Sequence, residues 1–257
     1  MRVLLLGDIM GKAGRGAVAA LLPALREEVA ADYVVANAEN AAAGRGTTAK
    51  IAKQLLESGV DVLTGGNHTW AMREFVEVLQ GELPALRPAN YPAGAPGSGV
   101  WSDGRLTVLN LIGRTFMEPL DDPFAVVDGL LESATGGSAI VVDFHAEATS
   151  EKQAFGWHLD GRVAAVVGTH THVPTADARL LPKGTAFVTD LGMCGARDSV
   201  IGTEAAAVVA KFRTGLPTRL PPEEKGTAVL NGVLVTIEDA TRQALSIERV
   251  DRVWEPD

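Results

Sequence analysis

Two histidines stand two positions apart in this 257-residue chain, in the segment GTHTH at residues 168–172. The segment follows the apolar run VAAVVG, which predicts a buried strand over residues 163–168. In an extended segment, the imidazoles of His170 and His172 project to the same side. Because neutral imidazole is the commonest metal ligand, the pair predicts half of a metal site.

Other potential ligands follow other predicted strands. Short apolar runs predict buried strands over residues 3–7, 33–38, 60–64 and 139–144. The polar residues at the ends of all five strands are Asp8, Glu39, Asn40, Asn67, His68, His145, His170 and His172. Of the five histidines, only His158 lies outside this set.

The chemistry of this set indicates a metal centre. Carboxylate, amide oxygen and imidazole together suit Mn, Fe or Zn. Even without His68, seven potential ligands exceed the need of one ion, and a carboxylate can bridge two ions. The sequence therefore predicts a dinuclear site.

The elements between the strands support this arrangement. Helices are predicted over residues 17–31, after a glycine-rich turn, over residues 72–80, and up to residue 56 from an N-cap at Thr47 or Thr48. Alternating strands and helices are typical of a mostly parallel sheet covered by helices. Ligands bind such sheets at the carboxyl ends of the strands, where the polar set falls.

The second half of the chain continues with similar elements. Residues 86–104 predict a long loop, and residues 214–225 a Pro-rich connection. Strands are predicted over 106–113 and 186–189, helices over 123–132 and 149–159, and paired antiparallel strands over 227–237 and 244–253. We expect one domain over residues 1–257, since no repeat or linker interrupts it.

Composition excludes several classes of protein. A net charge of −9 argues against a groove for nucleic acid, although metal ions would supply local positive charge for a small phosphorylated substrate. The lone cysteine, Cys194, fits a reducing compartment. The N-terminal apolar run is too short for a signal peptide or a membrane span, so we expect a cytoplasmic protein without membrane contacts.

The ordered motifs resemble those of the calcineurin-like metallophosphoesterases, and specifically their bacterial YmdB-like branch. The segments that carry the resemblance are LLLGDIMGKAGR, NAENAAAGRG, GGNHTW, RPANYP, VDFHAEATSEK, VGTHTHVPTAD and DLGMCGARDSVIG. The resemblance implies an α/β sandwich of mixed sheets flanked by helices, a two-metal site at strand ends, and a homo-oligomer. It also implies phosphodiesterase activity, with 2′,3′- or 3′,5′-cyclic nucleotides among the substrates.

The same resemblance assigns the ligands. Asp8, Asn40 and His172 would hold one ion, Asn67, His145 and His170 the other, and Glu39 would bridge them. Iron and manganese are the expected metals, with zinc a third option. The segment Asp8-Ile9-Met10 lacks the histidine that the broader superfamily has, and Glu39-Asn40 stands where an aspartate normally bridges; the YmdB-like branch shares both departures.

The expected mechanism is attack on phosphorus by a hydroxide held between two ions about 3.5–4 Å apart. The leaving oxygen then needs a proton, and His68, adjacent to Asn67 but not itself an expected ligand, is the candidate acid. Two other functions use the same centre: a phosphomonoesterase, and a regulatory nucleotide-binding protein with little turnover.

Other readings of the sequence are weaker. Gly7, Gly11, Gly14 and Gly16 do not have the spacing of a dinucleotide or P-loop fingerprint. Cys194, between turn residues, is better explained as a small buried thiol than as a nucleophile. Three loop residues that follow strands either line the pocket or have structural roles: Asn90, Arg114 and Asp198.

Overall fold

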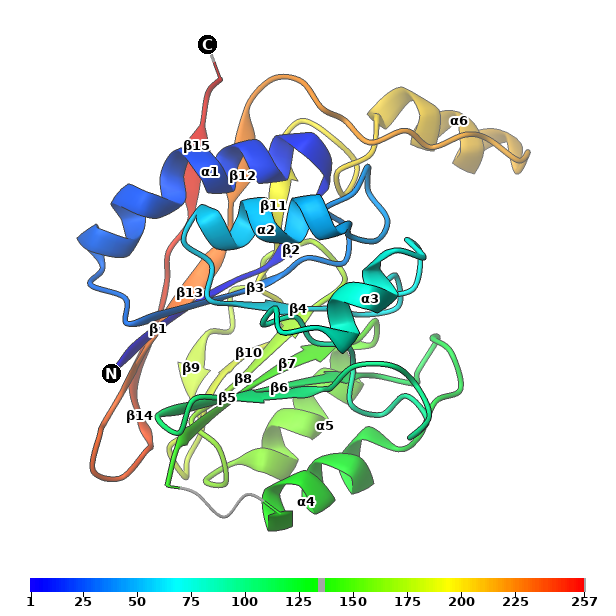
Figure 1. Cartoon of the computed structure of the whole chain (residues 1–257). Helices are drawn as coiled ribbons and strands as arrows, with labels where there is room; N and C mark the ends of the chain where they lie inside the picture. The colour runs from blue at the N-terminus through cyan, green and yellow to red at the C-terminus, as the bar shows by residue number, and fades with distance from the viewer. Residues whose placement is uncertain (134–136, 257) are drawn as a thin grey trace.

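Two large sheets face each other, and helices cover their outer sides (Figure 1). This computed structural model describes residues 1–133 and 137–256. From top to bottom in Figure 1, a helical layer, two sheets and a second helical layer follow one another. The prediction of an α/β sandwich with mixed sheets flanked by helices is therefore confirmed.

The first sheet holds five strands, of which three neighbours are parallel. Its order is β14 (Ala244–Arg249), β13 (Gly232–Ile237), β1 (Arg2–Leu6), β3 (Tyr33–Asn37) and β4 (Val62–Thr64). Strand β13 runs antiparallel to both of its neighbours. The carboxyl ends of β1, β3 and β4 therefore lie at one edge of the sheet.

The second sheet holds six strands, of which four neighbours are parallel. Its order is β5 (Val100–Ser102), β6 (Leu106–Ile112), β7 (Ala139–His145), β8 (Ala165–Thr169), β10 (Ala186–Val188) and β9 (Arg179–Leu180). The edge strands β5 and β9 run antiparallel to their neighbours.

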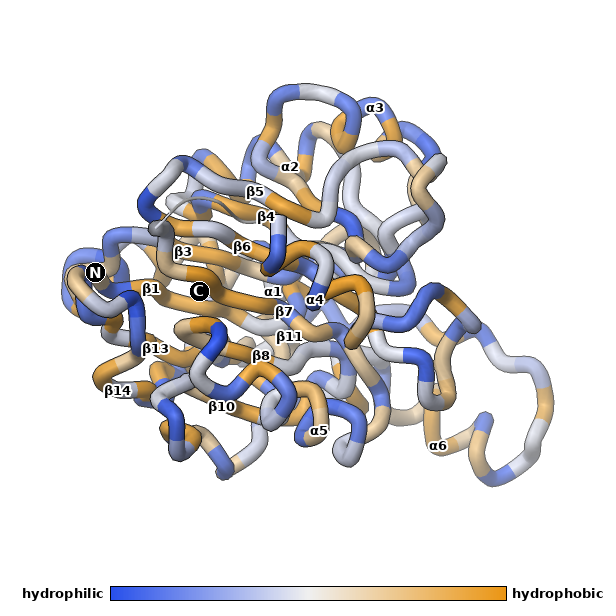
Figure 2. Tube along the Cα trace, turned by 90° about the horizontal axis from the view of Figure 1, so that it is seen from below, coloured by the Kyte–Doolittle hydropathy of each residue, from blue (hydrophilic) through white to orange (hydrophobic). Residues whose placement is uncertain are grey.

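Alternate residues of the central strands are buried in different cores. In β1, Val3 and Leu5 pack between the two sheets, whereas Leu4 and Leu6 pack under helices. The helices on that side are α1 (Gly11–Glu28), α2 (Ala49–Glu57) and α3 (Phe75–Gln80). On the opposite side, α4 (Pro123–Ser133) and α5 (Thr149–Leu159) cover the second sheet. Burial on both faces explains the continuous apolar runs, which form the hydrophobic centre in Figure 2.

A third, four-stranded sheet was not predicted. Its order is β15 (Arg252–Trp254), β12 (Ala228–Leu230), β11 (Met193–Ala196) and β2 (Asp8–Ile9). The two long antiparallel strands predicted near the C-terminus do pair, but each breaks in two and passes between sheets. Asn231 lies at the break, where its side chain donates to the carbonyl of Met193 over 2.9 Å.

Helix α1 begins six residues before the predicted start, so the glycine-rich turn expected there is wrong. Gly14 explains the difference, because a Cβ at this position would overlap the backbone carbonyl of Cys194 in β11. The glycine that lowers helix propensity is therefore required for close packing of α1 on the third sheet. Pro23 lies inside the helix, which continues to Glu28.

The remaining differences are smaller. Helix α3 begins at Phe75, three residues later than predicted, and the long loop over residues 86–104 contains β5. Helix α6 (Ala205–Thr214) was not predicted, and it projects from the body in both views (Figures 1 and 2). None of the helices in the described ranges is long and apolar enough to cross a membrane.

The packing of α1 predicts opposite effects for two helical glycines. We expect Gly14→Ala to lower the free energy of unfolding by about 2 kcal/mol, because the new methyl group has no room. Gly129→Ala in α4 is the matched control, since nothing lies within 4 Å of its Cβ position. That change should raise stability by about 0.5–1 kcal/mol. Urea denaturation of both variants measures the difference, and a Gly14→Ala protein as stable as the parent would contradict the packing argument.

Candidate metal centre

The predicted ligands meet where the carboxyl ends of the two large sheets face each other. Strands β1, β3 and β4 of one sheet and β7 and β8 of the other end there. The structure brings together all of the predicted ligands: Asp8, Glu39, Asn40, Asn67, His145, His170 and His172.

One group of donor atoms surrounds the imidazole of His145. Its Nε2 lies 3.1 Å from Glu39 Oε1 and 2.9 Å from Asn67 Oδ1. The Nδ1 atom of His170 lies 3.0 Å from the same nitrogen. Donor atoms of Glu39, His145 and His170 all lie within 4.8 Å of one another, which is close enough to bind one ion.

A second group adjoins the first through Glu39. Asn40 Nδ2 lies 3.2 Å from Glu39 Oε1 and 3.2 Å from His172 Nε2. Asp8 Oδ1 lies 3.8 Å from His172 Nε2. A half-turn of the Asn40 amide would aim its oxygen, the ligating atom, at the same place. Glu39 thus contacts both groups of donor atoms.

Each of the three histidines has one ring nitrogen held from outside and the other directed into the site. His145 Nδ1 lies 3.0 Å from Thr169 Oγ1, and His172 Nδ1 donates to the carbonyl of Ile201 over 2.9 Å. His170 Nε2 lies 3.1 Å from a carboxylate oxygen of Glu147. Such outer partners fix the tautomer and direction of metal-ligating histidines.

The extended conformation predicted for the GTHTH segment is wrong. Strand β8 ends at Thr169, and His170 and His172 have φ values of 100° and 66°, in the left-handed region. Both imidazoles still reach the site, although each belongs to a different group of donors. Non-glycine residues in this region are strained, and such strain is concentrated at functional sites.

Electrostatics at the site favour a positive charge. Burial raises the pKa of Asp8 to about 6. Burial alone would lower the pKa of His145, but the carboxylates of Glu39 and Asp8 raise it to about 9. Burial would likewise raise the pKa of Glu39, yet His145 lowers it to about 2. Burial and the neighbouring His145 lower the pKa of His170 to about 3. The raised pKa of His145 therefore marks the place where the surrounding carboxylates favour positive charge.

Two further observations fit a bound cation. Asp8 Oδ1 is buried and has no hydrogen-bond partner among the described residues, which is unusual for a carboxylate oxygen. Gly66 leaves space beside Glu39 and His145, since a Cβ there would overlap the donor atoms of both residues. The donor set is also the mixture of imidazole, carboxylate and amide that suits transition metals.

Residues that support the ligands were missed in the sequence. Asp143 is buried inside β7 and accepts hydrogen bonds from Thr64, from Thr169 over 2.6 Å and from Asn37 over 3.2 Å. Thr169 thereby connects Asp143 to His145. The signal was a charged residue inside an otherwise apolar strand, where it needs buried partners.

A buried ion pair supports the loop that carries His170 and His172. Lys152 Nζ lies 2.6 Å from Asp190 Oδ2, and both side chains are 1% exposed. The backbone N–H and the hydroxyl of Thr171 donate to the same oxygen over 3.2 and 2.8 Å. Asp190 follows β10, so a search for polar residues after predicted strands would also have identified it.

A cavity of about 480 Å³ opens over the ligands. His68 lines it, and the backbone N–H of His68 donates to Glu39 Oε2 over 2.8 Å. Arg45, which sequence reasoning missed, lines the same cavity. Burial lowers the pKa of His68. The negative charge of Glu39 opposes this shift, whereas the positive charge of Arg45 adds to it.

The other candidates have structural roles. Asn90 is buried and accepts from the backbone N–H of Ile112 over 2.9 Å, whereas Arg114 pairs with Asp122 and Asp198 with Arg197 at the surface. None of the three is among the described residues that line the cavity. Burial raises the pKa of the Cys194 thiol to about 12, as expected for an inert side chain. His158 lies 2.8 Å from Asp128, apart from the site.

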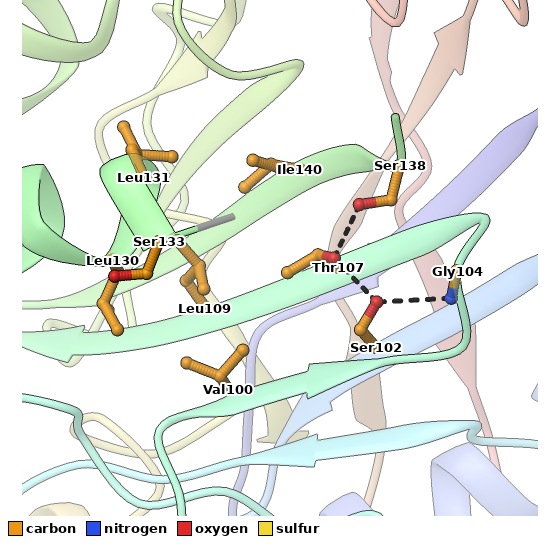
Figure 3. Close-up of a pocket in the computed structure, with 10 residues that line it drawn as sticks. All are labelled: Val100, Ser102, Gly104, Thr107, Leu109, Leu130, Leu131, Ser133, Ser138 and Ile140. Atoms are coloured by element: carbon orange, nitrogen blue, oxygen red, sulfur yellow. Dashed lines mark hydrogen bonds between the residues drawn. The ribbon is translucent and has the colours of Figure 1, made fainter. Parts of the chain in front are cut away.

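A second cavity, of about 280 Å³, lies between α4 and strands β5 to β7 (Figure 3). Leu109, Leu130 and Ile140 face it, and Thr107 Oγ1 lies 2.8 Å from the hydroxyls of both Ser102 and Ser138. Its described lining holds no ionisable side chain, so it offers no acid, base or metal ligand.

Comparison with known proteins agrees with this geometry. The model of the family described as YmdB-like protein matches residues 4–250. The chain belongs to this family. It is 47% identical to a 2′,3′-cyclic-nucleotide 2′-phosphodiesterase of Bacillus subtilis strain 168, over 97% of this chain and 96% of the relative.

Two crystal structures show the same fold over nearly the whole chain. A hypothetical protein of Thermus thermophilus is 43% identical, with a TM-score of 0.92 and full coverage of both chains. A novel phosphatase of Mycoplasma pneumoniae is 36% identical, with a TM-score of 0.93 and coverage of 99% of this chain and 94% of that one. The predictions of the family and of a hydrolase are confirmed.

The hydrogen bonds that connect His145 to Asp143 through Thr169 predict that a change at Thr169 lowers metal affinity without unfolding the protein. Thr169→Val removes the hydroxyl between Asp143 and His145, and we expect metal affinity to fall about 10–100-fold with the fold intact. Thr185→Val is the matched control, since this threonine is also buried but lies at the amino end of β10, where its hydroxyl bonds the carbonyls of Leu159 and Val163 and the N–H of Gly161. Titration of the metal-free variants with Mn²⁺ measures the effect. Equal affinities for both variants would contradict the assigned support.

Proposed function

We propose that this protein is a metal-dependent phosphodiesterase that opens 2′,3′-cyclic nucleotides by hydrolysis of the 2′ ester bond. Water adds to phosphorus, the 2′ oxygen leaves, and a 3′-nucleotide is the product. The observation that carries the proposal is Asp8 Oδ1, a buried carboxylate oxygen that has no hydrogen-bond partner among the described residues and lies 3.8 Å from ring nitrogens of His145 and His172. The 47% identity to a 2′,3′-cyclic-nucleotide 2′-phosphodiesterase supports the substrate class.

The residues assigned to the ions follow the two groups of donors. Asp8, Asn40 and His172 would hold one ion, and Asn67, His145 and His170 the other. Glu39 contacts both groups and would bridge them. Two divalent ions, iron or manganese with zinc a third option, would lower the pKa of a bound water and neutralise charge on the phosphate.

The side chains at the cavity supply the remaining chemistry. His68 lines this cavity, and we assign to it the donation of a hydrogen bond or a proton to the leaving oxygen. Its pKa is lowered in the free protein, and the negative charge of a bound phosphodiester would raise it. Arg45 would bind phosphate oxygen from the cavity wall, as a charge-assisted donor.

A phosphomonoesterase is the second candidate. The observation that favours it is the similarity to a structure described as a novel phosphatase, at 36% identity. The ligand set serves both reactions, and only the substrate distinguishes them. The assignment to a cytoplasmic homo-oligomer stays a prediction from the sequence.

The first test is metal content together with turnover. We expect about two ions per chain, hydrolysis of bis-p-nitrophenyl phosphate, and conversion of 2′,3′-cyclic AMP to 3′-AMP, all abolished by EDTA. Chromatography separates 3′-AMP from 2′-AMP and so identifies the bond that breaks. Hydrolysis of p-nitrophenyl phosphate alone would assign a phosphatase, and metal binding without any turnover would assign a binding protein.

The bridging role of Glu39 gives a second expectation. Glu39→Ala should lose both ions, because this carboxylate contacts both groups of donors. Elemental analysis measures the loss, with His158→Ala as the histidine control, which should keep both ions. Retention of two ions by Glu39→Ala would refute the bridge.

The role of His68 is tested apart from metal binding. His68→Ala should keep both ions and lower kcat by about 10²–10⁴-fold, the range for loss of a general acid. The kcat for bis-p-nitrophenyl phosphate should fall less than the kcat for 2′,3′-cyclic AMP, because p-nitrophenolate is a good leaving group and needs no proton. Equal losses on both substrates would exclude the acid role.

A further inference from the structure

The cavity above the proposed metal ligands has one polar side and one aliphatic side. Polar residues such as Glu39, His68 and His172 line one part of it, and four larger aliphatic side chains contribute to the rest. These aliphatic side chains are Met10, Ile201, Leu220 and Pro222, here called the aliphatic wall. A volume of about 480 Å³ exceeds the need of a phosphate group, and it falls within the range of about 300–1,000 Å³ found for small-molecule sites.

The wall presents apolar surface that the fold itself does not bury. Ile201 is 49% exposed and Leu220 is 38% exposed, although both belong to the lining of a polar cavity. A ligand that covers these exposed aliphatic groups gains free energy from their burial. Thr203 and Thr218 place hydroxyl groups in the same lining.

Backbone hydrogen bonds hold the wall in place. Val200 and Thr203 exchange two hydrogen bonds of 2.9 and 3.0 Å, which closes the turn around Ile201. The N–H of Glu204 donates to the carbonyl of Pro221 over 3.0 Å, and the N–H of Glu223 to Gly202 over 2.8 Å. The segment that contains Leu220 is thereby joined to the turn, so the wall is formed before a ligand arrives.

Ile201 is the residue that connects the wall to the metal ligands. Its φ of 48° lies in the left-handed region, where a β-branched residue costs about 1–3 kcal/mol. Its carbonyl accepts the hydrogen bond from His172 Nδ1 over 2.9 Å. Glycine would make the same turn and present the same carbonyl without strain. The strained isoleucine is therefore explained by the surface that its side chain supplies to the cavity.

We propose that the aliphatic wall is a nucleobase subsite, on which the base of a mononucleotide packs while its phosphate lies at the metal ligands. This inference rests on the proposed function for the position of the phosphate. No aromatic or charged side chain is among the described residues of the wall, so the contact is with the face of the ring. The subsite favours nucleotides over base-free phosphodiesters but discriminates weakly among the four bases.

The test separates binding of the base from binding of phosphate. Calorimetry of the metal-loaded protein compares 3′-AMP with inorganic phosphate. Ile201→Gly removes the side chain, keeps the carbonyl and relieves the strain, so misfolding does not explain a loss. We expect Ile201→Gly and Leu220→Ala each to lower the affinity for 3′-AMP about tenfold and to leave the affinity for phosphate unchanged. Ile201→Val should retain most of the 3′-AMP affinity.

Phe212→Ala is the control for an exposed hydrophobic residue, since Phe212 is 83% exposed on α6 and outside the cavity lining. Its affinities should equal those of the parent. Unchanged 3′-AMP binding in both wall variants would overturn the subsite. Equal loss of 3′-AMP and phosphate in Ile201→Gly would also overturn it, because Ile201 would then act only through His172.

Kinetics distinguish this proposal from the proposed function. The KM for 2′,3′-cyclic AMP should rise about tenfold in Leu220→Ala, and the KM for glycerol 1,2-cyclic phosphate, which has no base, should not. If the parent protein hydrolyses neither compound, the proposed function fails. The calorimetric comparison then still decides whether the wall binds a base.

Discussion

The burial of two carboxylates beside three histidines is the constraint on which the rest of the structure depends. Asp8 and Glu39 are almost completely removed from water, and a buried charge is tolerated only when it is compensated. In the protein alone, a proton on His145 compensates in part, which is why the pKa of His145 rises to about 9. The compensation is incomplete, because Asp8 Oδ1 lacks a hydrogen-bond partner among the described residues and burial raises the pKa of Asp8 to about 6. The fold is therefore organised around positive charge at this place.

Two facing sheets can surround the buried carboxylates with donors from several sides, which a single sheet could not do. The ends of parallel strands in one sheet present side chains along a line, but an ion needs donors on several sides. Here Glu39 comes from one sheet, and His145 and His170 come from the other, within 4.8 Å. The donors are then held from behind, by Asp143 through Thr169 and by the Lys152–Asp190 ion pair beneath the strained histidine loop. Orientation of the ligands thus depends on the same sheets that form the core.

Much of this arrangement follows from local sequence, and the failures share one cause. The strands that end at Asp8, Glu39 and His145 were predicted because strands buried on both faces read as apolar runs, and polar residues mark their ends. The start of α1 was wrong because its position is decided by contact between Gly14 and β11, a partner distant in sequence. The conformation of His170 was wrong for the same reason, since its backbone N–H bonds to Asp8 Oδ2. Asp143 was missed because its partners come from three other strands and strand ends.

The polar and aliphatic sides of the cavity stand on different parts of the fold. The proposed metal chemistry and the proposed contact with the base therefore depend on different elements. The proposed ligands lie at strand ends inside the core, so a change there would disturb the fold and the proposed metal site together. Three of the four residues of the aliphatic wall, Ile201, Leu220 and Pro222, stand on a segment that carries the projecting helix α6 and contributes little to the core. A change of side chain in that segment would alter the proposed contact with the base and leave the core contacts of the proposed ligands in place. The hydrogen bond between Ile201 and His172 joins the two sides, which aligns the wall with the ligands it serves.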